Sequence, residues 1–208
     1  MNQKNSLGLN NCFLDLDDPI QLFKTWMDEA KKSEPNDPNA VSLATSNKNN
    51  FPSVRMVLLK DFSKNGFVFY TNLKSKKGNE LKENPKVAMC FHWKSLLRQI
   101  RINGTVTQVA DEVADKYYNS RSYESRIGAW ASKQSEELIN RDQLINSIKE
   151  YKNKYNEENK VPRPSHWSGW ILSPLSIEFW LDGDNRIHER LKYTKASSGQ
   201  WSKSLLSP

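Results

Sequence analysis

Three side chains with cationic or titratable groups alternate near the C-terminus, in the segment Arg186-Ile187-His188-Glu189-Arg190. Alternate residues of a β-strand share one face, so we expect Arg186, His188 and Arg190 to point the same way. Such groups repel one another unless an anionic or electron-rich group faces them. The segment therefore predicts a site for an anion or an electron-rich ring.

A second cluster combines a cation with hydroxyl groups. Tyr117, Arg121 and Ser125 are spaced four residues apart, so a single helix through them would place all three on one face. A guanidinium beside hydroxyl groups can hold a phosphate. The alternative is a helix that ends at a serine, with an arginine exposed to solvent.

A third cluster, Ser75-Lys76-Lys77, opens a short predicted helix just after Tyr70-Thr71. Free N–H groups and the helix dipole favour a phosphate at such a helix start. Lysines in a first turn oppose that dipole, so a bound phosphate would explain their presence. A solvated lysine run is the alternative.

Arg55 and Lys60 bracket the apolar run Met56-Val57-Leu58-Leu59 on a predicted strand. Residues five apart on a strand point to opposite faces unless a bulge or the strand end turns one of them. The pair fits two interpretations. It either solvates the rim of a sheet, or it supplies two phosphate ligands beside an apolar wall that packs on a ring.

The formal net charge is +7 at pH 7, and the excess is local: residues 60–101 hold ten basic and three acidic side chains. This favours an anion bound at one place, with a solvated lysine-rich face as the alternative. The sequence has no Walker loop, Gly-rich dinucleotide turn or nucleophile elbow, and its three histidines have no spacing typical of a metal site. Residue patterns alone thus predict an anion-binding protein with two phosphate sites and no metal.

The elements that must position these groups are mostly strands, predicted at 40–46, 53–59, 67–71, 87–92, 98–109, 166–172, 176–181, 187–194 and near Trp201. Ser63-Lys64-Asn65-Gly66 predicts a hairpin with a type I′ turn. Asp18 before Pro19 is typical of a helix start, and helices are predicted at 19–32, 75–83, 111–120, 125–132 and 136–156. Because the strands follow one another through short turns, the pattern favours an antiparallel barrel over a βαβ fold.

The length of 208 residues fits a single domain. We expect it to cover residues 18–208, with the polar segment Met1–Asp17 flexible. The sequence has no run of about 18 apolar residues and no apolar core of a secretion signal at its start. The two cysteines, Cys12 and Cys90, show no paired spacing. We therefore expect a cytoplasmic protein with no membrane partner.

Together these segments resemble the pyridoxine (pyridoxamine) 5′-phosphate oxidase family. The matching motifs run in order from about residue 18 to the C-terminus: RMVLLK at 55–60, FVFYTNL at 67–73, Arg98-Gln99, Ser120-Arg121 with Ser125, IGAWASKQS at 127–135, PSHWSG at 164–169 and IEFWLDGDNRIHER at 177–190. Several independent motifs in register are far more specific than any one of them. The family usually has Arg-Lys where this chain has Lys76-Lys77, which keeps the charge but loses a bidentate fork.

The resemblance implies a β-rich α+β fold, namely an FMN-binding split β-barrel with peripheral helices, in a homodimer with FMN at the subunit interface. It implies oxidation of pyridoxamine 5′-phosphate or pyridoxine 5′-phosphate to pyridoxal 5′-phosphate, with O2 as electron acceptor and H2O2 as product. The flavin would carry the redox chemistry while the protein aligns the rings.

Carried over residue by residue, the resemblance places FMN contacts at Arg55, Met56, Val57, Leu58, Leu59, Lys60, Tyr70, Thr71, Lys76, Lys77, Gln99, Gln134, Ser135, Trp180 and Arg190. It places substrate contacts at Lys60, Tyr117, Arg121, Ser125, Arg186, Ile187 and His188. Arg186 and His188 are the expected catalytic residues, over the substrate ring beside the reacting carbon. We expect both to orient and polarise the substrate, and we leave open whether His188 is also a general base.

Two other functions fit parts of the pattern. A split-barrel flavoprotein could act on another substrate, although Tyr117, Arg121, Ser125, Arg186 and His188 would serve the vitamer rather than the flavin. A nucleic-acid-binding β-barrel would explain the basic stretch and the aromatic residues, and it predicts salt-sensitive affinity without a yellow cofactor. We favour the oxidase, with no nucleic-acid partner.

Overall fold

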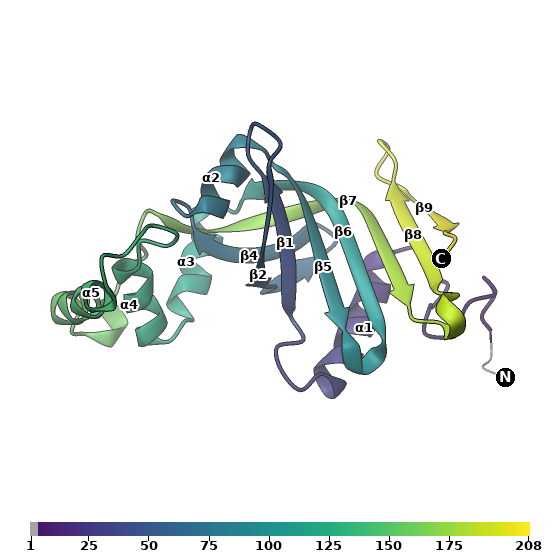
Figure 1. Cartoon of the computed structure of the whole chain (residues 1–208), viewed down its shortest axis with the longest axis horizontal. Coiled ribbons are helices and arrows are strands. Elements are labelled where there is room, and N and C mark those ends of the chain that lie inside the picture. Colours follow the sequence, from purple (N-terminus) through teal and green to yellow (C-terminus); the bar gives the residue numbers. More distant parts are fainter. Residues whose placement is uncertain (1–3) are drawn as a thin grey trace.

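A computed structural model describes residues 4–208 (Figure 1). Within that range the strands are β1 (Ala40–Ser46), β2 (Pro52–Leu58), β3 (Asp61–Ser63), β4 (Gly66–Asn72), β5 (Lys86–Trp93), β6 (Arg98–Gln108), β7 (Trp167–Leu181), β8 (Glu189–Lys195) and β9 (Trp201–Leu205). The α-helices are α1 (Pro19–Ser33), α2 (Lys76–Glu83), α3 (Asp111–Asn119), α4 (Tyr123–Ala131) and α5 (Arg141–Lys154). None of the described helices is long and apolar enough to cross a membrane.

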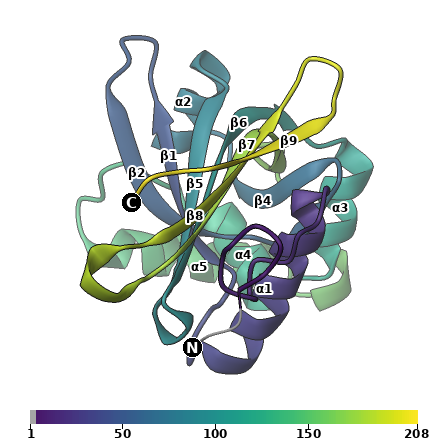
Figure 2. The same ribbon diagram turned by 90° about the vertical axis from the view of Figure 1, so that its right-hand side faces the viewer.

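The strands form one antiparallel sheet in the order β2-β1-β5-β6-β7-β4-β3, with β8 beside β7 and β9 beside β8. The long strand β7 joins its parts, because its first half pairs with β4 and its second half with β8, while β6 pairs along its other edge. The sheet curls around α1, and α3, α4 and α5 gather at one end (Figures 1 and 2). The predicted antiparallel barrel is thus confirmed as a curled half-barrel.

Helix α1 begins at the predicted residue, because the Asp18 carboxylate accepts a hydrogen bond from the N–H of Ile20 (2.9 Å). Its apolar face is buried in the core and comprises Leu22, Phe23, Trp26, Met27 and Ala30. Phe23 meets the rings of three sheet residues edge-on, with centroid distances of 4.8 to 5.4 Å. Burial of one such ring contributes about 1.5–3 kcal/mol, so this face fixes α1 inside the sheet.

The N-terminal segment packs on the same core from residue 4 onward. Phe13 is fully buried against Trp26, with ring centroids 5.2 Å apart, and Leu9 is also buried. The Trp26 indole N–H donates to the Cys12 carbonyl (2.7 Å). Residues 1–3 of the segment expected to be flexible, 1–17, lie outside the described residues. Leu9 and Phe13 of the same segment belong to the core, which therefore begins before residue 18.

The predicted hairpin forms, since Ser63 pairs with Gly66 across a two-residue loop. The predicted type I′ turn is wrong, because Asn65 lacks the positive φ that such a turn requires and only Gly66, at φ 139°, has one. A Cβ at Gly66 would lie 2.2 Å from the Leu172 carbonyl oxygen. Glycine here serves the close approach of β4 to β7 rather than the turn type.

The strands predicted at 166–172 and 176–181 are a single strand, β7. Pro174 within it cannot donate a ladder hydrogen bond, but it faces Gly104 where the pairing of β6 with β7 shifts register. A Cβ at Gly104 would lie 2.1 Å from the Ser173 carbonyl oxygen. The glycine therefore keeps the two strands close through the irregularity, and the proline ends no strand.

The break between the helices predicted at 111–120 and 125–132 is confirmed, since α3 ends at Asn119 and α4 begins at Tyr123. The shared face of Tyr117, Arg121 and Ser125 required one continuous helix, so it does not form. The Ser122 hydroxyl caps α4 by accepting from the N–H of Ser125 (3.4 Å). The turn between α3 and α4, and not a continuous helix, therefore sets the positions of the three side chains. The helix predicted at 136–156 is shorter at both ends.

Candidate functional site

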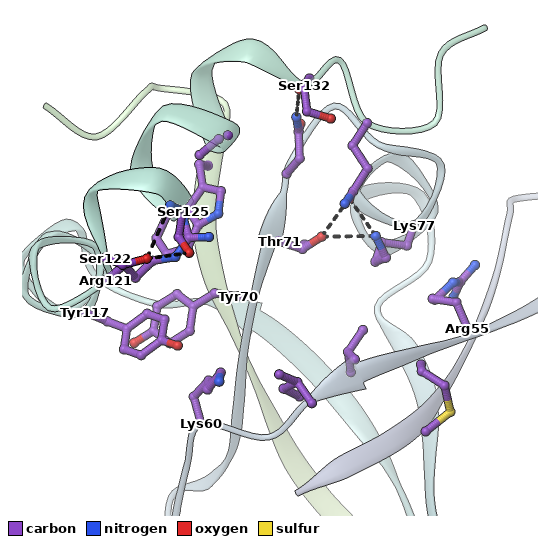
Figure 3. A pocket seen from close by; sticks show the side chains of 18 residues that line it. Arg55, Lys60, Tyr70, Thr71, Lys77, Tyr117, Arg121, Ser122, Ser125 and Ser132 are labelled. Atoms are coloured by element: carbon purple, nitrogen blue, oxygen red, sulfur yellow. Dashed lines mark hydrogen bonds between the residues drawn. The ribbon is translucent and has the colours of Figure 1, made fainter. Parts of the chain in front are cut away.

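A cavity of about 710 Å³ is bordered by β2, β4, α2, α4 and the turn before α4 (Figure 3). Of the predicted site residues, its lining includes Arg55, Met56, Val57, Leu58, Lys60, Tyr70, Thr71, Lys77, Tyr117, Arg121, Ser125 and Gln134. Sequence reasoning missed six lining residues: Asn72, Ser122, Gly128, Ala129, Ser132 and Trp167. The fold thus brings together three of the four predicted clusters.

Helix α2 presents one lysine of its first turn to the cavity. The helix begins where the Ser75 hydroxyl accepts from the N–H of Gly78 (3.2 Å). A Cβ at Gly78 would lie 2.5 Å from the Leu73 carbonyl oxygen, so the helix lies directly on the preceding chain. Lys77 consequently lines the cavity, whereas Lys76 is exposed and does not.

Lys77 is a partly buried cation with neutral partners. Its Nζ donates to the Thr71 hydroxyl (3.1 Å) and to the side-chain oxygen of Gln134 (2.8 Å) (Figure 3). Burial, with the positive charge of Arg55 second, lowers the pKa of Lys77 to about 8. Among residues 4–208, no carboxylate forms an ion pair with Lys77. An anion bound here would raise the pKa of Lys77 and stabilise its ammonium form.

Arg55 is held by a buried carboxylate. Its guanidinium lies 3.1 Å from Glu80 Oε2 and also donates to the Ser53 hydroxyl (2.6 Å) and the Leu43 carbonyl (3.1 Å). Burial opposes the charge on Glu80, but hydrogen bonds from Ser53 and Thr45 and the charge of Arg55 outweigh it and hold the pKa of this carboxyl below its ordinary value. Arg55 is therefore fixed in orientation at the cavity wall.

Across the cavity from Lys77, Arg121 lies against aromatic rings. Its guanidinium carbon is 4.8 Å from the ring centroid of Trp167 and 5.9 Å from that of Tyr118. Nη1 is buried and has no hydrogen-bond partner, and burial lowers the pKa of Arg121. The hydroxyls of Ser122 and Ser125 are 2.9 Å apart beside it (Figure 3). This arrangement has the donors of a phosphate site.

A stack of aromatic rings lies on the Arg121 side of the cavity (Figure 3). The Tyr70 and Tyr117 rings lie 4.0 Å apart and nearly parallel, and the Trp167 ring lies 5.3 Å from Tyr70. Burial, with Tyr117 second, raises the pKa of Tyr70. The Tyr70 hydroxyl is therefore a neutral hydrogen-bond donor at ordinary pH. The stack fixes the Tyr117 hydroxyl on the same side as Arg121 (Figure 3).

Three predicted FMN residues lie beside the cavity without lining it. Leu59 is buried in the core at 4% exposure, and Lys76 is exposed. Ser135 is exposed and has a φ of 74°, a conformation that serine rarely adopts. It follows Gln134, so its backbone turns the chain away from the cavity at that point.

The remaining predicted residues form a second group on β6, β7 and β8. Gln99, Trp180 and Arg190 are direct neighbours across these strands. The His188 ring lies 4.6 Å from that of Trp180, and Ile187, His188 and Arg190 line a second cavity of about 510 Å³. Figure 1 shows the turn between β7 and β8 at the opposite end of the long axis from α4. The two groups therefore do not meet within one chain.

Arg186, His188 and Arg190 do not follow one another along a strand as predicted. Arg186 is exposed in a short 3₁₀ turn at φ 65°, and β8 begins after His188. Carboxylates face the other two: Arg190 donates to Glu178 (2.7 and 2.9 Å), and His188 Nδ1 lies 3.0 Å from Asp182 Oδ1. The expected repulsion is thus compensated partly within the chain, by residues that sequence reasoning missed.

Two family models match the chain. Residues 27–155 match the model described as pyridoxamine 5′-phosphate oxidase, and residues 167–208 match the pyridoxine 5′-phosphate oxidase C-terminal dimerisation region. This chain belongs to the pyridoxamine 5′-phosphate oxidase family. The family resemblance predicted from the sequence is therefore confirmed.

Relatives in this oxidase family match over nearly the whole chain. The pyridoxine/pyridoxamine 5′-phosphate oxidase of Pelagibacter ubique is 74% identical over 208 residues, all of both chains. That of Allorhizobium ampelinum is 53% identical over 197 residues, 94% of this chain and 95% of its own. The order and spacing of the motifs are thus those of the oxidase family from end to end.

Solved structures support the same fold. PhzG from Burkholderia lata, in complex with tetrahydrophenazine-1-carboxylic acid, is 29% identical, with a TM-score of 0.88 over 95% of this chain and 96% of its own. A pyridoxamine 5′-phosphate oxidase-related, FMN-binding protein from Nostoc punctiforme has a TM-score of 0.74 at 14% identity, over 92% and 98% of the two chains. The predicted β-rich α+β split barrel with peripheral helices is confirmed.

Proposed function

We propose that this chain is an FMN-dependent oxidase that converts pyridoxamine 5′-phosphate or pyridoxine 5′-phosphate to pyridoxal 5′-phosphate. The amine reaction consumes O2 and water and releases ammonia and H2O2, and the alcohol reaction consumes O2 and releases H2O2. The main support is one cavity with a carboxylate-free cation on each side, Lys77 and Arg121. A relative 74% identical over its full length is named for this activity.

The Lys77 side of the cavity fits the phosphate of FMN. Lys77 is partly buried without an anion, Thr71 offers a hydroxyl, and Arg55 is oriented by Glu80. A phosphate dianion would receive charge-assisted hydrogen bonds from both cations. When bound, FMN would supply the two-electron chemistry between the substrate carbon and O2. The chain itself would bind the phosphate and align the ring against the apolar wall Met56–Leu58.

The Arg121 side fits the phosphate of the substrate. The unpaired, buried Nη1 of Arg121 is a donor without an acceptor, which is costly unless a ligand satisfies it. Tyr117 and Ser125 supply hydroxyl groups, and Lys60 supplies a second cation. Two phosphates held on opposite sides of the cavity would bring the substrate ring toward the flavin.

The second group of residues would complete the site only in a homodimer with FMN at the subunit interface. The C-terminal segment matches a dimerisation region. Beside the cavity, the edge strand β2 exposes Val54 and Met56 at 68% and 61%, as an interface strand would. In such a dimer one copy would supply the flavin contacts Gln99, Trp180 and Arg190 and the substrate contacts Arg186, Ile187 and His188 to the cavity of the other.

Arg186 and His188 would act on the substrate ring rather than on the flavin. A guanidinium can stack on the pyridine ring and stabilise its ionised 3-hydroxyl group. His188 would hydrogen-bond the reacting substituent and so hold the substrate carbon in line with the flavin. Cys12 and Cys90 are both free thiols, which fits a reducing compartment, and we place the reaction in the cytoplasm.

The visible spectrum and turnover of the purified protein test this function. We expect a yellow protein that, in air, converts pyridoxamine 5′-phosphate to the aldehyde with release of H2O2. Pyridoxamine without its phosphate is the matched control substrate and should react with a kcat/KM lower by at least about a hundredfold, because two cations lose their partner. A colourless protein that FMN cannot reconstitute, or a yellow protein without aldehyde production, would refute the proposal.

A further inference from the structure

The turn between β7 and β8 holds its residues in a defined conformation. The backbone N–H of Asp182 donates to the Leu97 carbonyl (2.9 Å), which anchors the start of the turn. Asn185 and Arg186 have φ values of 55° and 65°, which non-glycine residues adopt rarely. Such strain persists where the surrounding contacts determine the backbone. The side chain that leaves this turn, His188, is only 18% exposed.

Two groups face the same ring nitrogen of His188. Asp182 Oδ1 lies 3.0 Å from Nδ1, and the backbone N of Gly183 lies 3.3 Å from it. They require opposite protonation states, because a carboxylate accepts a proton from Nδ1 whereas an N–H donates to a bare Nδ1. The Gly183 N–H donates a hydrogen bond to Nδ1, whereas the Asp182 carboxylate lies at ion-pair distance. The carboxylate oxygen is the nearer of the two groups and carries a negative charge, which favours a proton on Nδ1. The face of the imidazole packs near Trp180, with centroids 4.6 Å apart.

We propose that Asp182 is a positioning residue that holds His188 in the tautomer with the proton on Nδ1 and with Nε2 bare. In the part of the chain that the structure describes, no hydrogen bond occupies Nε2, which is therefore free to accept one. The identity of the group that donates to Nε2 rests on the proposed function: it is the amine of pyridoxamine 5′-phosphate or the hydroxyl of pyridoxine 5′-phosphate. Asp182 thus acts on the reaction only through the imidazole.

The tautomer can be measured without any turnover. The chain has three histidines, so ¹⁵N-labelled, FMN-loaded protein gives three imidazole spin systems, and His188→Asn identifies the one of interest. At about pH 8, where an ordinary imidazole is neutral, we expect a protonated-type Nδ1 and a bare-type Nε2. In Asp182→Asn the side-chain amide can donate to Nδ1, so the proton should move to Nε2. Asp182→Ala leaves only the Gly183 N–H and should have the same effect.

Steady-state kinetics test the consequence for the reaction. Asp182→Asn should lower kcat for pyridoxamine 5′-phosphate at least about tenfold, a modest part of the 10²–10⁴-fold range of acid–base groups, with KM and the bound flavin unchanged. Asp184→Asn is the matched control, because Asp184 is exposed and lies two residues after Asp182, and the substitution removes the same charge. It should leave both the tautomer and kcat as in the parent protein.

Each outcome decides the matter. A bare or exchanging Nδ1 in the parent protein, or a doubly protonated ring at about pH 8, overturns the proposal whether or not the protein is active. A moved proton with unchanged kcat overturns the role in the reaction. A parent protein that lacks oxidase activity but has the expected tautomer refutes the proposed function and leaves the Asp182–His188 pair established. If kcat falls and flavin is lost in both Asp182→Asn and Asp182→Ala, the role of Asp182 is merely structural, which also overturns the proposal.

Discussion

Replacing Arg121 by methionine separates substrate-phosphate binding from every other role of the cavity. Methionine keeps an unbranched side chain that can pack on Trp167 but removes the guanidinium, whose Nη1 is buried without a partner. We expect Arg121→Met to retain FMN and the fold and to bind pyridoxamine 5′-phosphate poorly. The affected quantity is the affinity for the phosphate group, not the chemistry at the ring.

The size of the effect follows from the contacts. A hydrogen bond to a charged group contributes about 1.5–3 kcal/mol, and about 1.4 kcal/mol corresponds to tenfold in affinity. The KM for pyridoxamine 5′-phosphate should therefore rise by roughly 10- to 150-fold. Loss of the cation–π contact with Trp167 costs about 0.5–2 kcal/mol, whereas removal of a desolvated, unpaired cation is favourable. The free energy of unfolding of the apo protein should then change by less than about 1 kcal/mol.

The assay compares two substrates and two variants. Initial rates of H2O2 release are measured with pyridoxamine 5′-phosphate and with pyridoxamine, and urea unfolding is followed by tryptophan fluorescence. Arg126→Met is the matched control, since Arg126 on α4 also has a buried nitrogen without a partner, Nε, but does not line the cavity. It should change stability without changing the preference for the phosphorylated substrate.

The preference ratio is the quantity that can refute this reasoning. In Arg121→Met the ratio of the kcat/KM value for the phosphorylated substrate to that for pyridoxamine should fall by roughly 10- to 150-fold, because only the phosphorylated substrate loses a contact. If both substrates lose equally, Arg121 supports the site structurally and does not bind the phosphate. If Arg126→Met collapses the ratio as well, the effect belongs to α4 as a whole.

Three further changes test other parts of the site. Because the pKa of Lys77 is lowered to about 8, FMN binding must take up a proton above that pH. Titration by flavin fluorescence should show the affinity for FMN falling by up to about tenfold per pH unit above pH 8, and Lys77→Arg should make the affinity less dependent on pH. Glu80→Gln removes the charge beside Arg55 and should lower the free energy of unfolding by about 2–3 kcal/mol at neutral pH. Because the pKa of Glu80 is depressed, its contribution is present above the ordinary carboxyl pKa and lost as pH falls through the folded-state value, so urea midpoints of parent and variant should converge in acid. Gly66→Ala places a Cβ against the Leu172 carbonyl and should lower the free energy of unfolding by about 2–4 kcal/mol, measured by thermal unfolding.

Local signals in the sequence were sufficient for the elements that they control. Asp18 and Ser75 cap the predicted helices, because a cap depends on a side chain and the backbone two or three residues away. The spacing of Tyr117, Arg121 and Ser125 also fits a continuous helix, so spacing alone did not decide whether they share a face. The helices predicted at 111–120 and 125–132 gave the break, and Ser122 caps the second helix.

Contacts between residues far apart in the sequence were not predicted, for a different reason. Glu178 and Arg190 meet because β7 and β8 pair, and pairing register depends on the whole sheet. The sequence offered one clue, that Glu178 precedes Trp180 by two residues and so shares its strand face. The family resemblance predicted FMN at a subunit interface, but the motifs did not say which residues each copy supplies. The division between the cavity and the second group on β6, β7 and β8 therefore came only from the structure.

The local excess of positive charge takes on a specific meaning in the fold. Arg55 is neutralised by Glu80, whereas Lys77 and Arg121 are desolvated without a carboxylate, which destabilises the folded chain when no ligand is bound. Phosphate ligands would be the missing counter-ions, so their binding energy includes relief of that cost. Of these three cations only Lys77 belongs to the basic stretch 60–101, and Lys82 and Lys94 of that stretch are exposed and line neither cavity. FMN should therefore raise the unfolding temperature more than added sulfate does, since only a ligand that reaches the desolvated cations removes the penalty.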